Sequence, residues 1–178
     1  QDGHMLRDDN KLFDILAKWN FWDRETIETG YPRSLLSQIL PHLKSPEVIV
    51  IKGVRRGGKS TLMLQIMNQL RSEGVKAEDI LYINFEEPLF IGQQGVETLD
   101  GLFRIYRERI NPQRFPYIFL DEIQRVQDWE RWARVKTDLR EAKIFVTGSA
   151  ANLIGAEYSA LLTGRNLSFT LYPLIFTE

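Results

Sequence analysis

A glycine-rich segment with one lysine and two hydroxyl residues follows a short run of β-branched residues. It fits the pattern G-x-x-x-x-G-K-[ST] and consists of Gly53, Val54, Arg55, Arg56, Gly57, Gly58, Lys59, Ser60 and Thr61. Glycines let the backbone curl so that successive N–H groups point inward, and the start of a following helix adds its positive dipole end. This chemistry suits the phosphates of a nucleotide, and we expect all nine residues to form the binding loop.

Two side chains of this loop have more specific expected roles. Lys59 would reach the β and γ phosphates as a point charge, which makes it a binding and a catalytic candidate. The Ser60 hydroxyl would hold Mg²⁺. The role of Arg55 and Arg56 is open, because they could reinforce phosphate binding or lie in solvent.

Two adjacent carboxylates end another apolar run, Tyr117-Ile118-Phe119-Leu120. Ligands of open α/β sheets bind at the carboxyl ends of the strands, so Asp121 is expected beside the loop as a second residue that holds Mg²⁺. Glu122 points to the other side of the chain and could polarise the attacking water. The alternative for both residues is a strand that ends in a solvated acidic turn.

Further polar residues follow two other predicted strands. If the strand before Thr147 and Ser149 inserts between the loop strand and the Asp121 strand, either side chain would emerge near the γ-phosphate and sense or position it. Both could instead cap the next helix. Asn84 could hydrogen-bond Glu122 and hold it away from the water, or it could simply form a turn.

Short apolar runs alternate with amphipathic stretches from residue 47 onward, which is the pattern of an α/β domain with a parallel sheet. Strands are predicted at 48–52, 80–85, 117–121, 143–147 and 167–171. Helices are predicted from Ser60 to before Gly74, from about Leu99 to before Pro112, and from near Asp128. Before residue 46 the apolar positions recur at helical spacing, so an N-terminal helical segment is expected.

The composition excludes several classes of protein. The 178 residues include 23 Lys and Arg, 24 Asp and Glu, and no cysteine, for a net charge of −1. A disulfide framework and a broadly basic nucleic-acid surface are therefore excluded. Apolar runs stay well short of the roughly 20 residues of a membrane helix. With no export signal in view, we expect a cytoplasmic protein without membrane contact.

These patterns divide the chain into three parts. Residues 1–5 contain Gly3-His4-Met5, which is typical of the scar left by tag removal, and they are left out of the fold prediction. Residues 6–46 are expected to form a helical extension that packs on the core. Residues 47–178 are expected to form the nucleotide-binding core.

Several motifs together resemble the prokaryotic AAA-type ATPases over about residues 30 to 178. They are the loop at 53–60, the stretch 119–130 with its Asp-Glu pair and Trp129, Thr147-Gly148-Ser149, Leu161-Leu162-Thr163-Gly164-Arg165, and the segment 171–178. More narrowly, the chain is similar to the archaeal and bacterial branch in which this domain precedes a C-terminal region of uncertain function. Neither a lid domain nor that region follows the fifth predicted strand, so the ATPase core alone is expected here.

The resemblance implies a three-layer P-loop NTPase fold whose parallel five-stranded sheet has the order 5-1-4-3-2. It implies binding of ATP or ADP with Mg²⁺, hydrolysis of ATP that drives or switches a partner interaction, and a sensor role for Thr147 and Ser149. Arg165 matches a position that acts near the γ-phosphate of a neighbouring subunit, which implies a homo-oligomer. The alternative is a loop arginine paired with a surface carboxylate. Whether the partner is a protein or a nucleic acid is left open.

Adenine recognition follows only from the same resemblance. In this branch the segment before the first strand lies over the base, which nominates Tyr31, Pro32 and Arg33. The alternative is that 35–43 is a packing helix with Arg33 on its rim. For the function as a whole, the alternative to an ATPase is a nucleotide-dependent binding or regulatory module with little hydrolysis of its own.

Overall fold

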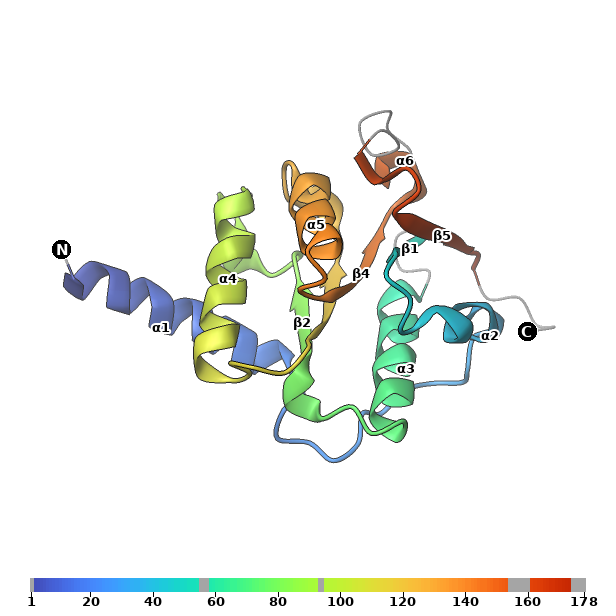
Figure 1. Cartoon of the computed structure of the whole chain (residues 1–178), viewed down its shortest axis with the longest axis horizontal. Helices are drawn as coiled ribbons and strands as arrows, with labels where there is room; N and C mark the ends of the chain where they lie inside the picture. The colour runs from blue at the N-terminus through green and yellow to red at the C-terminus, as the bar shows by residue number, and fades with distance from the viewer. Residues whose placement is uncertain (1, 55–57, 93–94, 154–160, 174–178) are drawn as a thin grey trace.

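A parallel five-stranded sheet forms the centre of the protein (Figure 1). The computed structural model describes residues 2–54, 58–92, 95–153 and 161–173. Its strands are β1 (Val48–Gly53), β2 (Ile80–Asn84), β3 (Tyr117–Asp121), β4 (Lys143–Gly148) and β5 (Asn166–Leu171). Their order is β2-β3-β4-β1-β5, and every neighbouring pair is parallel. This confirms the expected α/β fold and the order 5-1-4-3-2, with strand ends within one residue of the prediction.

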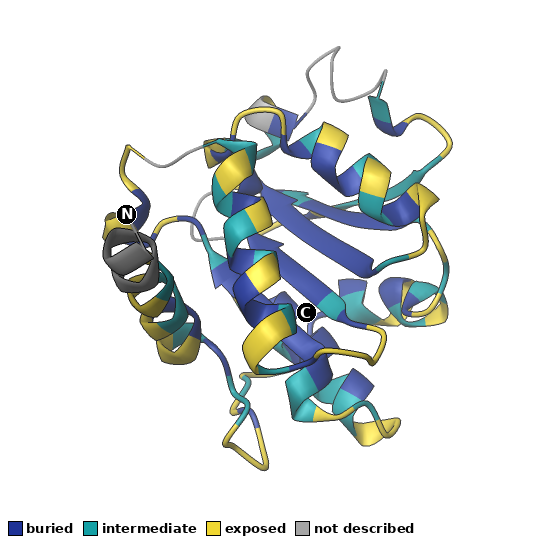
Figure 2. Cartoon of the chain, turned by 60° about the vertical axis from the view of Figure 1, so that its left-hand side comes forward, coloured by how far each residue is buried: buried dark blue, intermediate teal, exposed yellow. Residues whose placement is uncertain are grey.

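Helices cover both faces of the sheet. They are α1 (Asp2–Trp19), α2 (Ser34–Ile39), α3 (Lys59–Ser72), α4 (Val96–Arg109), α5 (Trp129–Asp138) and α6 (Ala150–Leu153). Short 3₁₀ turns lie at Leu40–His42, Ala77–Asp79, Pro88–Phe90 and Ile123–Arg125. Figure 2 shows the buried strands enclosed by helices whose outer faces are exposed. The result is the three-layer arrangement that the sequence predicted.

Alternate residues of β1, β2, β3 and β4 supply two separate hydrophobic cores, whereas β5 contributes to the second core alone. In β1, Val48 and Val50 pack in one core with α1, α4 and α5, whereas Ile49 and Ile51 pack in the other with α2 and α3. Burial on both faces explains why the strand has a continuous apolar sequence instead of an alternating one. The helix α3, which begins at Lys59, therefore lies on the second face of the sheet.

The N-terminal helix packs on the side of the sheet that is formed by β2. Ile15 and Leu16 of α1 belong to the core that also contains α4, and α1 contacts both α4 and β2. The helix begins at Asp2, so residues 2–5, which were left out of the fold prediction, form its first turn. The division into an extension and a core remains a prediction, since both parts share this hydrophobic core.

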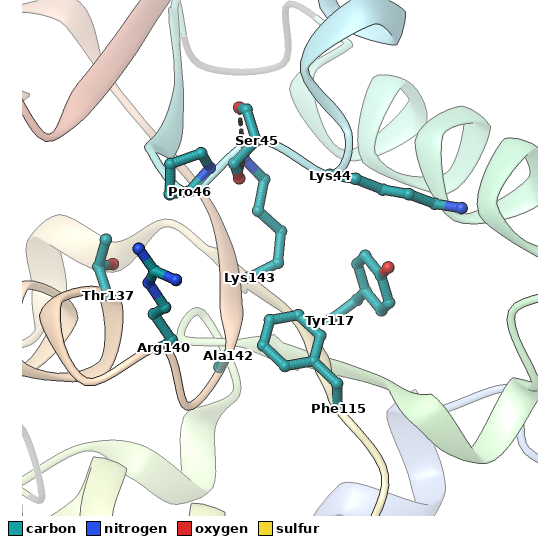
Figure 3. Close-up of a pocket in the computed structure, with 9 residues that line it drawn as sticks. All are labelled: Lys44, Ser45, Pro46, Phe115, Tyr117, Thr137, Arg140, Ala142 and Lys143. Atoms are coloured by element: carbon teal, nitrogen blue, oxygen red, sulfur yellow. Dashed lines mark hydrogen bonds between the residues drawn. The ribbon is translucent and has the colours of Figure 1, made fainter.

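A cavity of about 370 Å³ lies at the amino ends of the strands, opposite the glycine-rich loop. Figure 3 shows Lys143 extending through it toward Ser45, with Phe115 and Tyr117 on one side and Arg140 on the other. Lys143 is 2% exposed, and its Nζ donates to the carbonyl oxygens of Ser45 and Glu47, each at 2.6 Å. Burial lowers the pKa of Lys143 to about 8.

This lowered pKa predicts a specific pH dependence of stability. Because the unfolded lysine keeps its ordinary, higher pKa, the unfolded state binds more protons above pH 8, and the free energy of unfolding should rise with pH. We expect a rise of about 1 to 2 kcal/mol between pH 7.5 and 9.5. Lys143→Met should remove this rise, whereas Lys44→Met, at an exposed lysine of the same cavity, should retain it. Urea unfolding at several pH values measures both, and equal slopes in the two variants would contradict the prediction.

Candidate functional site

The carboxyl ends of β1, β3 and β4 bring most of the predicted site residues together. Gly53 ends β1 and Lys59 begins α3, so the loop connects the strand to the helix start as expected. Ser60 and Thr61 lie in the first turn of α3. The predicted loop residues Arg55, Arg56 and Gly57 lie outside the described part of the chain.

Two glycines of the loop are required by local geometry. Gly58 has φ +92°, and a Cβ there would lie 2.5 Å from Arg33 Nη1. A Cβ on Gly53 would lie 2.8 Å from the carbonyl oxygen of Leu171. The left-handed conformation and the close approach both exclude a side chain. These two residues therefore explain both glycine positions among the four fixed positions of the sequence pattern.

The Lys59 ammonium is buried and held across the loop. Its Nζ donates to the carbonyl oxygens of Gly53 at 3.0 Å and Val54 at 2.9 Å. It also forms an ion pair with Glu122 Oε1 at 3.4 Å. The cation that was predicted to bind phosphates thus lies beside the carboxylate that was predicted to activate water.

Asp121 is fully buried and accepts hydrogen bonds from three hydroxyl groups. Ser60 Oγ donates to Oδ2 at 2.6 Å, and the Tyr82 hydroxyl donates to the same oxygen at 2.5 Å. Thr147 Oγ1 donates to Oδ1 at 2.6 Å. Burial and the neighbouring Asp121 charge raise the pKa of Tyr82, so its hydroxyl remains a donor. The structure therefore places Ser60 and Asp121 in contact, as the sequence predicted for a shared metal.

Thr147 connects the two carboxylate residues. β4 inserts between β1 and β3, which was the condition for placing Thr147 at the site. Its Oγ1 also accepts a hydrogen bond from the Glu122 backbone N–H at 3.0 Å. Ser149 lies immediately before α6, and its carbonyl oxygen accepts from the Leu153 N–H. Ser149 thus occupies the position before a helix that the capping alternative requires, whereas the Thr147 hydroxyl bonds Asp121. Contact of Thr147 or Ser149 with a phosphate remains a prediction.

Glu122 is fixed by groups other than the one considered from the sequence. Gln124 Nε2 donates to Glu122 Oε2 at 2.5 Å. The backbone of Glu122 has a left-handed conformation with φ +56°. Asn84 Oδ1 instead accepts from the Glu86 N–H at 2.9 Å. Asn84 therefore forms a turn, and Gln124 restrains the carboxylate.

Arg165 lies at the amino ends of the strands, opposite the site residues at the carboxyl ends. It precedes β5, and its carbonyl oxygen accepts from the N–H of Val48 at the start of β1. Its Nε donates to Asp138 Oδ1 at 2.8 Å, which matches the surface-pair alternative. The length of β1 thus lies between Arg165 and the glycine at the end of that strand, and a role of Arg165 near the nucleotide of another subunit remains a prediction.

The segment proposed to lie over adenine is attached next to the loop. Gln65 of α3 donates to the Tyr31 carbonyl oxygen at 2.8 Å and accepts from the Arg33 N–H at 3.2 Å. The buried Arg33 side chain donates to the Tyr172 carbonyl oxygen at 2.6 Å. Tyr31 itself is 94% exposed. Contact of Tyr31, Pro32 or Arg33 with a base remains a prediction.

Sequence reasoning missed Tyr82 and Gln124. Tyr82 stands in an apolar run, where a tyrosine is normally interpreted as a core residue. Its register partner is Phe119, two residues before Asp121, and residues two apart share one face of a strand. That alternation, combined with the strand order, is the signal that could have identified Tyr82.

Most of the chain is similar to proteins of one family. A family model described as an AAA domain matches residues 45–178. An uncharacterized protein of Haemophilus influenzae is 35% identical over 144 residues, which are 80% of this chain and 35% of that protein. An uncharacterized protein of Methanocaldococcus jannaschii is 36% identical over 132 residues, or 74% and 28% of the two chains. The chain thus spans about a third of the length of these relatives.

Two solved structures share the fold at low sequence identity. PCH-2 of C. elegans matches with a TM-score of 0.54 and 11% identity, over 94% of this chain and 47% of that chain. A DNA polymerase III gamma subunit-related protein of Thermotoga maritima matches with a TM-score of 0.56 and 14% identity, over 81% and 47%. In the described part of the chain, no helix is both long and apolar enough to cross a membrane.

The shared role of Thr147 yields a stability prediction. Thr147→Val would leave Asp121 Oδ1 and the Glu122 N–H without their hydroxyl partner in a buried setting. We expect it to lower the free energy of unfolding by about 2 to 4 kcal/mol. Thr147→Ser keeps the hydroxyl and should cost about 1 kcal/mol for the lost methyl group. Urea unfolding followed by tryptophan fluorescence compares the two, and a valine variant as stable as the serine variant would contradict the hydroxyl's role.

Proposed function

The chain belongs to the AAA domain family, and on this premise we propose that it binds ATP with Mg²⁺ and hydrolyses ATP to ADP and phosphate. The observation that carries the proposal is the convergence of Lys59, Ser60, Asp121 and Glu122 at one end of the sheet. We further propose that the chain acts in the cytoplasm, that residues 47–178 are the catalytic core and 6–46 an extension, and that hydrolysis drives or switches a partner.

Binding of the triphosphate requires Lys59 to exchange its partners. In the structure its ammonium donates to two loop carbonyl oxygens. A phosphate oxygen is a stronger acceptor than a carbonyl, because the hydrogen bond to it joins two opposite charges. The N-terminus of α3 and the backbone of the loop add further donors toward the phosphates. Lys59 would thereby move away from Glu122.

The residues near Asp121 fit Mg²⁺. A hydroxyl and a carboxylate are hard oxygen ligands, and Mg²⁺ in nucleotide sites uses one or two such protein groups together with phosphate oxygens and water. Ser60 would bind the ion directly, while Asp121 would hold Ser60 and the ion's water molecules. When bound, the ion neutralises negative charge on the phosphates.

Glu122 would act as the base for the attacking water. The water oxygen forms a bond to the γ-phosphorus, the bond from phosphorus to the β,γ-bridging oxygen breaks, and the water proton passes to the Glu122 carboxylate. The ion pair with Lys59 and the hydrogen bond from Gln124 both occupy this carboxylate in the structure. Transfer of Lys59 to the phosphates would release one of these restraints, which links base activation to nucleotide binding.

The contacts of Glu122 with Lys59 and Gln124 also favour a second candidate function. If they persist when nucleotide is bound, Glu122 cannot accept a proton, and the domain would act as a nucleotide-dependent binding or regulatory module with little hydrolysis. The two candidates share the binding site and differ in turnover. A measurement that separates binding from hydrolysis therefore decides between them.

Variants of Glu122 and Lys59 provide this test. Glu122→Gln should retain ATP affinity within about threefold and lower kcat by about 10²-fold or more, because the amide cannot accept the proton. Lys59→Ala should abolish ATP binding, while Glu86→Gln, at an exposed carboxylate nearby, serves as the control. Titration calorimetry and phosphate release measure the two properties. Equal turnover in Glu122→Gln and the unchanged protein would remove Glu122 from the mechanism, and negligible turnover in both would favour the regulatory module.

Arg165 is proposed to act between subunits of a homo-oligomer. In the natural full-length protein, Arg165→Ala should lower kcat at least tenfold without weakening nucleotide binding, since fingers of this kind contribute about 10³- to 10⁵-fold. Arg134→Ala removes another arginine that pairs with Asp138 and should have little effect on kcat. Size-exclusion chromatography with and without ATP establishes assembly. A loss smaller than tenfold in the assembled protein would contradict the assignment.

A further inference from the structure

The hydroxyl of Tyr82 contacts the same carboxylate oxygen as the proposed metal-binding serine. Both Tyr82 and Ser60 donate to Asp121 Oδ2, at 2.5 and 2.6 Å. Tyr82 is 5% exposed, and its hydroxyl comes from β2, which is separated from the loop strand β1 by the two strands β3 and β4. The phenol therefore connects an outer strand to the oxygen that faces the metal ligand.

The register of β2 and β3 explains how the Tyr82 hydroxyl reaches Asp121. Tyr82 pairs with Phe119, and Asp121 lies two residues farther along β3 on the same face. Two residues of a strand span about 6.6 Å, which is close to the length of a tyrosine side chain. Tyr82 and Phe119 both pack in the core beneath α3. The ring therefore extends along the sheet toward the start of α3, where Ser60 lies.

The backbone of Tyr82 is fixed in turn by the end of the N-terminal helix. The Asn20 side chain donates through Nδ2 to the Tyr82 carbonyl oxygen at 2.9 Å and accepts from the Tyr82 N–H at 2.7 Å. Nδ2 also donates to the Leu16 carbonyl oxygen at 2.7 Å, which attaches the amide to α1. Trp22 Nε1 donates to the Ile80 carbonyl oxygen at 2.8 Å. Side chains that follow α1 therefore bond to backbone groups along the outer edge of β2.

We infer that Tyr82 is a positioning residue for Asp121, and that Asn20 couples the docking of the N-terminal helix to the Mg²⁺ affinity of the nucleotide site. The inference rests on the proposed nucleotide function. Three hydroxyl donors fix the orientation of the Asp121 carboxylate, and loss of one allows it to rotate away from Ser60. Groups that orient a metal-binding residue without touching the metal typically change metal affinity by about 10- to 100-fold.

The test measures the Mg²⁺ dependence of nucleotide binding. ADP with a fluorescent ribose label is titrated at graded free Mg²⁺ and, separately, in excess EDTA. Tyr82→Phe should raise the half-saturating Mg²⁺ concentration roughly tenfold and leave affinity in EDTA unchanged within about twofold, because Lys59 and the loop are untouched. Tyr106→Phe is the matched control, since that buried tyrosine also donates through its hydroxyl, but to the Glu78 carbonyl, which lies before the amino end of β2 and away from Asp121.

Variants at Asn20 test the coupling to the helix. Asn20→Ala should raise the half-saturating Mg²⁺ concentration in the same direction as Tyr82→Phe, by at least threefold. If the alanine variant does not fold by circular dichroism, Asn20→Asp replaces it, because aspartate keeps the acceptor for the Tyr82 N–H and removes both amide donors. Unchanged Mg²⁺ dependence in the folded Asn20 variant would overturn the coupling.

The remaining outcomes separate this inference from the proposed function. If the unchanged protein binds ADP with Mg²⁺ and Tyr82→Phe shows a shift of less than threefold, the positioning role is overturned and the proposed function stands. If Tyr82→Phe weakens binding equally in Mg²⁺ and in EDTA, the residue is merely structural and the inference again fails. If the unchanged protein does not bind ADP at all, both the proposed function and the inference are wrong.

Discussion

The structure at the carboxyl ends of the strands depends on the hydrogen bonds that the buried carboxylate of Asp121 requires. A fully buried carboxylate must have hydrogen-bond donors, because an unpaired charge in an apolar interior costs several kcal/mol. Its donors come from α3, β2 and β4, through Ser60, Tyr82 and Thr147. These elements meet only when β4 lies between β1 and β3 and β2 lies outside β3. The strand order is therefore also the condition under which the Asp121 carboxylate receives its three hydrogen bonds.

The sequence permitted prediction of the elements and of the residues that meet at the strand ends. Continuous apolar runs identify buried parallel strands, and the glycine pattern identifies a loop whose geometry excludes side chains at Gly53 and Gly58. Contacts that depend on strand register were not predictable in the same way. Tyr82 resembles any core tyrosine until β2 is aligned with β3. Likewise, Gln124 contacts the Glu122 carboxylate at a point where the Glu122 backbone has a left-handed conformation, which the residue types do not indicate.

The site is arranged as a network of compensating charges. Lys59 and Glu122 neutralise each other, and loop carbonyl oxygens complete the coordination of the ammonium. Both groups are thus satisfied without a phosphate, which lets a cation and a carboxylate remain largely buried. The functions proposed for them, phosphate binding and proton transfer, require that this pairing be exchangeable. The low exposure of both side chains, 3% and 13%, makes the exchange sensitive to what enters the site.

The attachment of Asn20 and Trp22 to β2 has a consequence for assembly. The outer edge of a sheet presents unpaired N–H and C=O groups, which are a template for strands of other chains. Here side chains, not a further strand, bond to backbone groups of Tyr82 and Ile80 along that edge. A foreign strand could not pair with β2 there without first displacing the N-terminal segment. That segment therefore protects the protein against edge-to-edge aggregation, and its loss would expose a β-strand to self-association.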